Sequence, residues 1–146
     1  MPERELPHVD VDLAVTAFLP NSFVPPGRQK IDVYRRLSVA ATSEELAEVA
    51  GEIRDRFGPL PPETEQLVEV KELQLFAFAW GITGIRMEQG RFAVLSYKDE
   101  KQIRALQRRV GNDLRMVDPG VAYLLLPVMD LTGPEVIKHL KSVLKP

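Results

Sequence analysis

The spacing of apolar residues changes at Gly81 from a helical pattern to an alternating one. Between Thr42 and Trp80, apolar residues recur three or four positions apart, which is the spacing of one face of a helix. Beyond Gly81, the stretch "GIRMEQGRFAVLSY" consists of two alternating runs around the polar turn 88–91, as is typical of a β-hairpin. Helices that come first and hairpins that come later are typical of an α+β fold. The sequence therefore predicts N-terminal helices packed on a small antiparallel sheet of hairpins, with a C-terminal helix.

The clearest helix lies in "TSEELAEVAGEIRDRFGPLPP". Thr42 and Glu45 are three residues apart and form a capping box, which marks a helix start. Gly58 suits the left-handed residue that ends a helix, and Pro59 prevents continuation. The apolar residues of this helix share one face: Leu46, Val49, Ala50, Ile53 and Phe57.

A shorter helix precedes this one and a longer helix follows it. The shorter helix, 30–39, has its apolar residues Ile31, Tyr34 and Leu37 three positions apart. The longer helix starts at Pro61 and Pro62 and runs to about Trp80; its second half, "LQLFAFAW", is apolar almost all round, as expected of a buried central helix. The predicted core positions of the central helix are Leu67, Val70, Leu73, Phe76, Ala77 and Trp80.

The N-terminal part contains a lead-in, a strand and a connector. Residues 1–10 are polar and proline-bearing, and we expect a linker-like lead-in there, followed by a single α+β domain over 11–146. The run "VDLAVTAFLP" alternates and predicts a strand that ends at Pro20. The turn-rich residues 21–27 then form a connector whose prolines hold the first helix at a set angle.

The second half adds two helices and another hairpin. The stretch "DEKQIRALQRRVG" predicts a helix with Ile103, Leu106 and Val110 facing inward. A turn at 118–120, Asp-Pro-Gly, predicts the second hairpin. The last helix, "GPEVIKHLKSVL", has Pro134 in its first turn. Its apolar stripe is Val136, Ile137, Leu140, Val143 and Leu144.

Motifs argue against catalysis in this chain. It has no cysteine, which removes disulfides, thiolate metal ligands and cysteine nucleophiles. No glycine-rich phosphate loop precedes Lys-Ser or Lys-Thr, and no serine lies in a nucleophile elbow. His8 lies in the N-terminal tail, and His139 lies near Lys138 and Lys141, whose charges disfavour a bound cation. We therefore expect no enzyme activity, no cofactor, no metal and no small-molecule ligand.

Charge and hydropathy restrict the partners and the compartment. The net charge of −2 argues against a domain that coats nucleic acid with its whole surface. No apolar run approaches the roughly 20 residues that a membrane helix needs. The N-terminal stretch has charges but no apolar core, so it does not read as a signal peptide. We expect a cytoplasmic protein without membrane contact.

Four acidic residues, Glu44, Glu48, Glu52 and Asp55, follow helical spacing on the helix that starts after Thr42. They lie away from its apolar face, and like charges four apart cost about 0.2–0.5 kcal/mol per pair. One interpretation is a solvated face. The other is an acidic docking strip for an arginine-bearing partner.

A basic pattern follows in the helix after Asp99 and Glu100: Lys101, Arg104, Arg108 and Arg109. Acids in the first turn and bases in the last turn complement the helix dipole, which explains the pattern without a ligand. The alternative is a contact with DNA.

Two stretches carry a resemblance to a known family. The strings "FLPNSFVPPGRQKIDVYRRL" and "EELAEVAGEIRDRFGPLP", followed by a long apolar helix, resemble the C-terminal domain of bacterial transcription-repair coupling factors (Mfd). The most specific parts are "LP-x-x-F-V-P", "Y-R-R-L" and "R-D-R-F-G-P-L-P". The resemblance covers about residues 9–85; the remainder matches in element order.

The resemblance implies a function. Members of that family are large ATP-driven translocases on double-stranded DNA that dislodge stalled RNA polymerase and recruit the nucleotide excision repair machinery. Their motor, polymerase-binding domain and module that binds the repair ATPase UvrA precede the C-terminal domain. That domain packs on the UvrA-binding module in the resting protein and masks it. This chain is then a non-catalytic regulatory domain of an ATP-hydrolysing parent.

The resemblance also selects residues. In the family, acidic residues on the helix that ends in "D-R-F-G" contact basic residues of the masked module. By position these match Glu52 and Asp55, and Glu48 lies one turn before Glu52 on the same helix. The resemblance thus favours the docking-strip interpretation, with the intramolecular UvrA-binding module as partner.

Two alternatives remain. One is a stand-alone protein-interaction domain with a different partner. The other is a DNA-binding accessory module that uses the basic helix 99–110, whose duplex binding would depend steeply on salt.

Overall fold

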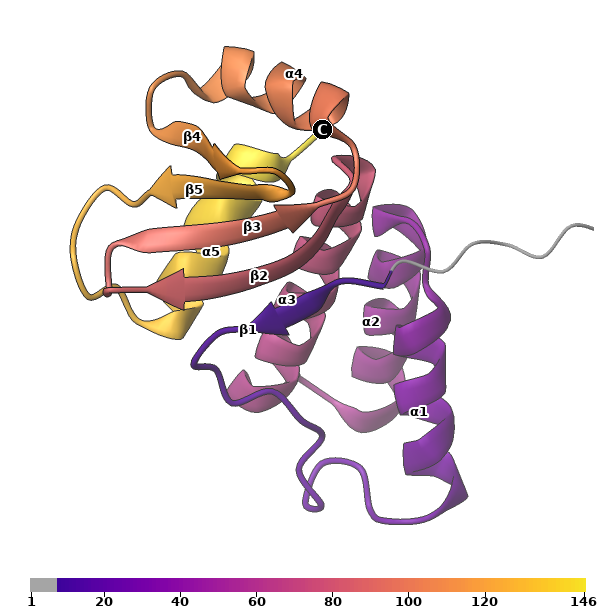
Figure 1. Ribbon diagram of the computed structural model, residues 1–146. Helices are drawn as coiled ribbons and strands as arrows, with labels where there is room; N and C mark the ends of the chain where they lie inside the picture. Colours follow the sequence, from indigo (N-terminus) through magenta and orange to yellow (C-terminus); the bar gives the residue numbers. More distant parts are fainter. Residues whose placement is uncertain (1–7) are drawn as a thin grey trace, which may run out of the picture. The chain divides into compact units, whose positions relative to one another are not determined.

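The structure, a computed structural model, describes residues 8–146 (Figure 1). It forms two compact units, one of Val15–Leu75 and the other of His8–Ala14 together with Phe76–Pro146. The first seven residues of the predicted lead-in, 1–10, lie outside the described part, and its last residue, Asp10, begins a strand. The prediction of one domain over 11–146 stays a prediction.

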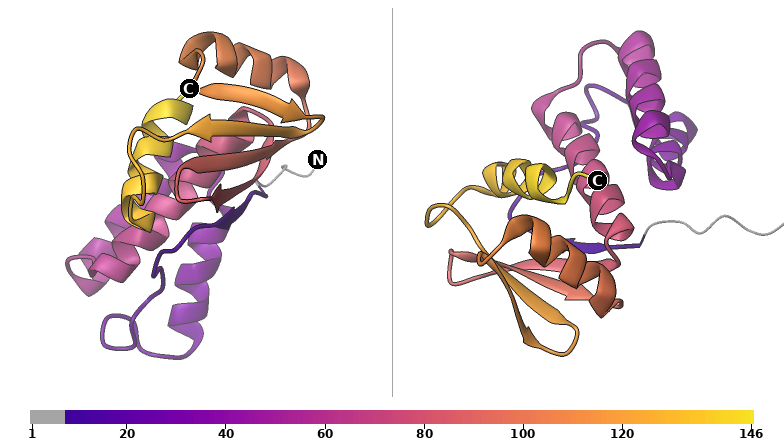
Figure 2. Two further views of the ribbon diagram at one scale, coloured as in Figure 1. Left: turned by 60° about the vertical axis from the view of Figure 1, so that its left-hand side comes forward. Right: turned by 90° about the horizontal axis from the view of Figure 1, so that it is seen from above.

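The first unit is helical. It contains α1 (Arg28–Val39), α2 (Ser43–Phe57) and the part of α3 (Pro62–Ala79) that ends at Leu75. Helices α1 and α2 lie side by side in all views (Figures 1 and 2). The three predicted N-terminal helices are therefore confirmed.

The buried face of α1 differs from the prediction. Of the three apolar residues singled out, only Leu37 is buried, together with Val33, while Ile31 is 68% exposed. Tyr34 stays at the surface, where its hydroxyl oxygen accepts a hydrogen bond of 2.9 Å from the Leu19 N–H. Residues four apart rather than three apart therefore define the inward face of this helix.

Both ends of α2 are those that the sequence predicts. Thr42 Oγ1 accepts a hydrogen bond of 3.1 Å from the Glu45 N–H, and the Glu45 carboxylate accepts one of 2.8 Å from the Ala41 N–H. At the other end, Gly58 has a φ of +100° and its N–H donates to the Arg54 carbonyl at 2.9 Å. Capping satisfies polar groups that a helix end otherwise leaves without partners, so α2 is a well-defined platform for its side chains.

The core of the first unit draws on its helices and on the connector before α1. Its buried members are Leu19, Val24, Val33, Leu37, Ala40, Leu46, Ile53 and Leu75. The Pro20 carbonyl accepts hydrogen bonds of 2.9 Å from the N–H groups of both Phe23 and Val24, which folds the connector into a turn. This turn carries apolar side chains into the core just before α1 begins.

The predicted strand through Pro20 is wrong over most of its length. The strand covers only Asp10–Asp12. Further on, the Phe18 N–H donates to the Glu63 carbonyl at 3.2 Å, and Thr64 Oγ1 donates to the Phe18 carbonyl at 3.1 Å. The backbone of Phe18 is therefore paired with the first turn of α3 and not with a sheet.

Burial along α3 is less uniform than predicted. Leu73 and Ala77 are fully buried, which confirms two predicted core positions. The other four are only partly buried: Leu67, Val70, Phe76 and Trp80. A helix that is apolar all round does not show from sequence which side faces the core.

Lys71 is a buried charged residue in the same helix. Its ammonium donates a hydrogen bond of 2.9 Å to the Ser38 carbonyl, in the last turn of α1. Burial disfavours the charged form and lowers the pKa of Lys71 below its ordinary value. Lys71 thus satisfies a helix-end carbonyl at the cost of a partly desolvated charge.

The second unit is built on a mixed sheet. Its strands are β1 (Asp10–Asp12), β2 (Ile82–Glu88), β3 (Phe92–Tyr97), β4 (Leu114–Asp118) and β5 (Val121–Leu125). The strand order is β1-β2-β3-β5-β4, and both predicted hairpins are present. The predicted hairpins are antiparallel, and the sheet is mixed because β1 pairs with β2 in parallel, with Asp10 opposite Gly84.

Two helices complete the second unit: α4 (Glu100–Val110) and α5 (Gly133–Leu144). Helix α5 lies along one face of the sheet, and its four buried residues are Val136, Ile137, Leu140 and Leu144 (Figures 1 and 2). In α4, Ile103 and Leu106 are fully buried, as predicted. The indole N–H of Trp80 donates to the Leu144 carbonyl at 2.7 Å, which ties the end of α5 to the residue after α3.

Candidate protein-docking site

The acidic residues of α2 form an exposed face. Glu44, Glu48, Glu52 and Asp55 are all exposed, whereas Ile53 between them is 2% exposed. Their spacing of three or four residues places them along one side of the helix. The structure thus confirms the predicted geometry of the strip, and its role as a docking surface stays a prediction.

One member of the strip is already engaged inside the unit. The Arg36 guanidinium of α1 forms an ion pair with the Glu52 carboxylate, across sixteen residues of sequence. The two side chains are 35% and 56% exposed, respectively. The sequence analysis did not select Arg36; the available signal was a basic residue in the last turn of α1.

A shallow groove of about 230 Å³ lies between α1 and α2 beside this pair. Its lining consists of Arg36, Val39, Ala40, Glu45, Glu48, Val49 and Glu52. Val39, which is 43% exposed, gives the groove an apolar part, and the carboxylates give it an acidic rim. The structure therefore brings Glu48 and Glu52 together at one groove and leaves Asp55 outside its lining.

The charges of the groove define what it can bind. Within residues 8–146, neither Glu48 nor Asp55 forms an ion pair, so both carboxylates are open to a cation from outside. An arginine side chain suits such a surface because its stem covers apolar groups while its planar guanidinium bonds carboxylates. The Arg36–Glu52 pair shows that this surface accepts a guanidinium.

The basic residues of α4 are placed differently. Arg104 pairs with Glu100 one turn earlier, at 2.9 Å, and the Arg109 guanidinium lies 5.9 Å from the centroid of the Trp80 ring. Asp99 caps the helix by accepting a hydrogen bond from the Lys101 N–H. Two of the four cations are therefore engaged within the second unit. A DNA contact through Lys101, Arg104, Arg108 and Arg109 stays a prediction.

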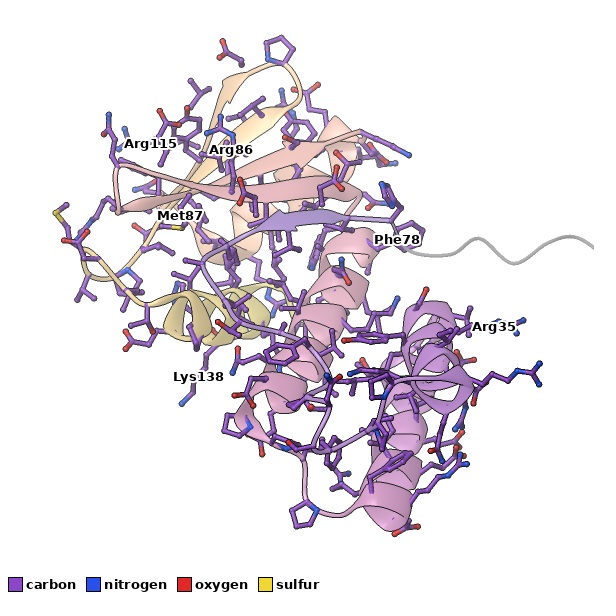
Figure 3. All side chains as sticks on the ribbon, turned by 90° about the horizontal axis from the view of Figure 1, so that it is seen from below. Arg35, Phe78, Arg86, Met87, Arg115 and Lys138 are labelled. Atoms are coloured by element: carbon purple, nitrogen blue, oxygen red, sulfur yellow. The ribbon has the colours of Figure 1, made fainter. Side chains whose placement is uncertain are left out.

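A second surface, not found by the sequence analysis, lies on the sheet. Strand register aligns Arg86 and Tyr123 through Val94, and Arg115 is paired with Tyr123. Figure 3 shows Arg86 and Arg115 on the side of the sheet opposite α5. The alternation of β2, β4 and β5 was the available signal, but it does not show which strands are neighbours.

Three polar groups of this sheet face contact one another. The Tyr123 hydroxyl donates to the Glu88 carboxylate at 2.6 Å, and Arg86 lies 3.5 Å from the same carboxylate. The hydrogen bond to Glu88 raises the pKa of Tyr123 above its ordinary value. Beside them, Phe92 and Tyr123 pack with ring centroids 5.9 Å apart. Charges of both signs are mixed here, so the face favours neither an anionic nor a cationic partner.

Among the described residues, no group of three or more histidine, aspartate or glutamate side chains could hold a metal ion. In the same part of the chain, no helix combines the length and the apolar character needed to cross a bilayer.

Comparison with known proteins identifies the family. Residues 13–107 match the TRCF domain. The chain belongs to the TRCF domain family. The match includes all of α1, α2 and α3, and therefore the groove and its acidic rim.

The relatives that this TRCF domain matches are much longer proteins. The chain is 34% identical over 85 residues to a transcription-repair-coupling factor of Staphylococcus aureus strain USA300, which covers 58% of the chain and 7% of that protein. It is 32% identical over 102 residues to the factor of Staphylococcus haemolyticus, covering 69% of the chain and 9% of that protein. The chain thus spans less than a tenth of the length of these relatives.

A solved structure has the same fold. It is the crystal structure of the C-terminal domain of a transcription-repair coupling factor, with a TM-score of 0.76 and 19% identity. The match covers 97% of this chain and 95% of the other. The α+β fold, with its C-terminal helix, is therefore shared by the two proteins along nearly their whole length.

Proposed function

We propose that this TRCF domain is the non-catalytic C-terminal regulatory domain of an ATP-driven DNA translocase in transcription-coupled nucleotide excision repair. It docks on the UvrA-binding module of the parent protein and masks it. The parent binds RNA polymerase, UvrA and double-stranded DNA through other domains. The observation that carries the proposal is the family match over residues 13–107, which includes the whole acidic groove.

The geometry of α2 supports docking through its acidic face. Ile53 is buried and both helix ends are capped, so the helix presents Glu48, Glu52 and Asp55 in a defined arrangement. A carboxylate held in this way can bond a partner arginine through two parallel N–H groups. We therefore assign the contact with the masked module to these carboxylates.

The strength of such contacts suits a reversible mask. Exposed ion pairs contribute about 0–1 kcal/mol each, and more when an interface removes them from water. A few of them hold the mask closed at rest, yet a competing partner can displace it. Because the mask and UvrA compete for one surface, weaker docking means stronger UvrA binding.

The test is UvrA binding by the full-length parent protein, wild type against Glu52→Ala/Asp55→Ala. We expect the double variant to stay folded by circular dichroism, because both side chains are exposed, and to bind UvrA several-fold more tightly. Glu44→Ala is the control, since it removes one negative charge of the same strip and helix but lies one turn before the three carboxylates to which the contact is assigned. Unchanged UvrA affinity in a folded double variant would refute the assignment of these residues.

A further inference from the structure

The docking surface already contains a bound guanidinium. Arg36 of α1 occupies the Glu52 carboxylate, and both residues line the groove between α1 and α2. Each of the two residues lies next to a buried residue of its own helix. Leu37 follows Arg36 in α1, and Ile53 follows Glu52 in α2. The pair therefore follows from how the two helices pack and does not require a partner protein.

This ion pair is positioned for exchange. The Glu52 side chain is 56% exposed, so a cation from outside can reach it without unfolding the unit. A second guanidinium at the same carboxylate would lie close to Arg36, and two like charges repel at that distance. A docking arginine that takes Glu52 therefore competes with Arg36 for this carboxylate.

We infer that Arg36 is an intramolecular competitor of the docking arginine and weakens the closed, masked state. The inference rests on the proposed function, because it presupposes that the α2 face docks on a basic surface. In the free domain, Arg36 neutralises Glu52 and lies at the groove. On docking, the partner arginine places its stem near Val39 and its guanidinium between Glu48 and Glu52, two carboxylates of the rim that lie one helical turn apart.

As a consequence, the masked state is less stable than it would be if Glu52 had no partner within the domain. The free energy of the Arg36–Glu52 pair is lost each time the mask closes. An exposed pair corresponds to a change of up to about fivefold in an equilibrium constant. Removing Arg36 should tighten docking by that factor, and UvrA affinity should fall accordingly.

The experiment measures UvrA binding by the full-length parent with Arg36→Ala. We expect UvrA affinity to fall between about twofold and fivefold. Arg35→Ala is the matched control. This substitution removes the same charge from the same helix, but the Arg35 side chain projects away from the unit (Figure 3). It should change UvrA affinity by less than about 1.5-fold, since it leaves the pair intact.

A third variant separates this inference from the proposed function. In Arg36→Ala/Glu52→Ala, UvrA affinity should equal that of Glu52→Ala, because Arg36 has no competitor role once Glu52 is absent. If Glu52→Ala raises UvrA affinity but Arg36→Ala leaves it unchanged or raises it, docking stands and the competitor role is wrong. If neither Glu52→Ala nor Asp55→Ala changes UvrA affinity, the proposed docking is wrong and the inference falls with it.

Discussion

Helices α2 and α4 carry charged faces of opposite sign, and the structure uses the two faces differently. On α4, Arg104 pairs within its own helix and Arg109 lies over Trp80. On α2, Glu48 and Asp55 have no ion-pair partner among the described residues, and Glu52 pairs with a residue of another helix. Both faces follow from simple spacing, yet on α2 a carboxylate without an ion-pair partner among the described residues, Glu48, lines the groove beside the paired Glu52.

The difference between the two faces depends on the residues around each charge. A run of like charges on a helix indicates an exposed face, but its capacity to bind depends on how many charges neighbouring residues already satisfy. Half of the α4 cations are engaged within the second unit, Arg104 with Glu100 of the same helix and Arg109 with the Trp80 ring. Of the four acidic residues in the α2 strip, only Glu52 forms an ion pair within residues 8–146, and its partner belongs to α1.

The largest losses of stability should come from substitutions on the inward faces of α2 and α4, which are buried in both helices. Ile53→Ala on α2 and Ile103→Ala on α4 should each lower the free energy of unfolding by about 2–5 kcal/mol, because both side chains are fully buried. Urea unfolding measures this, with Ile→Val at each position as the conservative control at about 0.5–1.5 kcal/mol. A loss below about 1 kcal/mol for either alanine variant would contradict its placement in a core.

Lys71 carries a charge that is buried instead of exposed. Its folded-state pKa lies below its unfolded value, so between these two values the unfolded chain binds more protons. The free energy of unfolding should therefore rise as pH increases through this window toward 10.5, the ordinary lysine value. Urea unfolding of wild type and Lys71→Met at a series of pH values isolates the effect, which should be missing in the variant.

The two ion pairs allow a direct comparison of the faces. A double-mutant cycle on Arg36 and Glu52 should give a coupling free energy of about 0.2–1 kcal/mol, and a cycle on Arg104 and Glu100 about 0.3–0.5 kcal/mol. Thermal unfolding of the single and double alanine variants measures both. Both couplings should shrink in 1 M salt, where the Debye length is about 3 Å. Zero coupling between Arg36 and Glu52 at low salt would show that the pair is not formed in solution.

The smallest effect should be DNA binding through α4. Because Arg104 and Arg109 are already engaged, duplex DNA should bind no better than nonspecifically, at about 10⁻⁴ M or weaker near physiological salt. Fluorescence anisotropy with a labelled duplex measures it, with Arg104→Ala/Arg108→Ala as the comparison. A micromolar affinity that this variant abolishes would instead support the DNA-binding accessory module.

The parts of the fold that the sequence predicted well depend on neighbours in the chain. The capping of α2 by Thr42 and its end at Gly58 involve residues three or four positions apart. The hairpins of β2 with β3 and of β4 with β5 depend on local turns. These interactions are visible in sequence because the residues that form them are close enough for spacing alone to specify them.

Local spacing also specifies part of the candidate site. Helical spacing alone placed Glu48, Glu52 and Asp55 on the exposed side of α2, opposite Ile53. It did not show that Glu48 and Glu52 share a groove with Val39 while Asp55 lies outside it, because Val39 belongs to another helix.

Contacts between segments far apart in the sequence depend on the tertiary structure. The pairing of Asp10 with Gly84 makes the sheet mixed, Trp80 donates to Leu144 across 64 residues, and Arg36 reaches Glu52 across sixteen. Each depends on how whole elements pack, which burial of apolar area governs and which no local pattern encodes. For this reason the sequence alone determined which charges α2 exposes, and packing determined which of them remain free to bind.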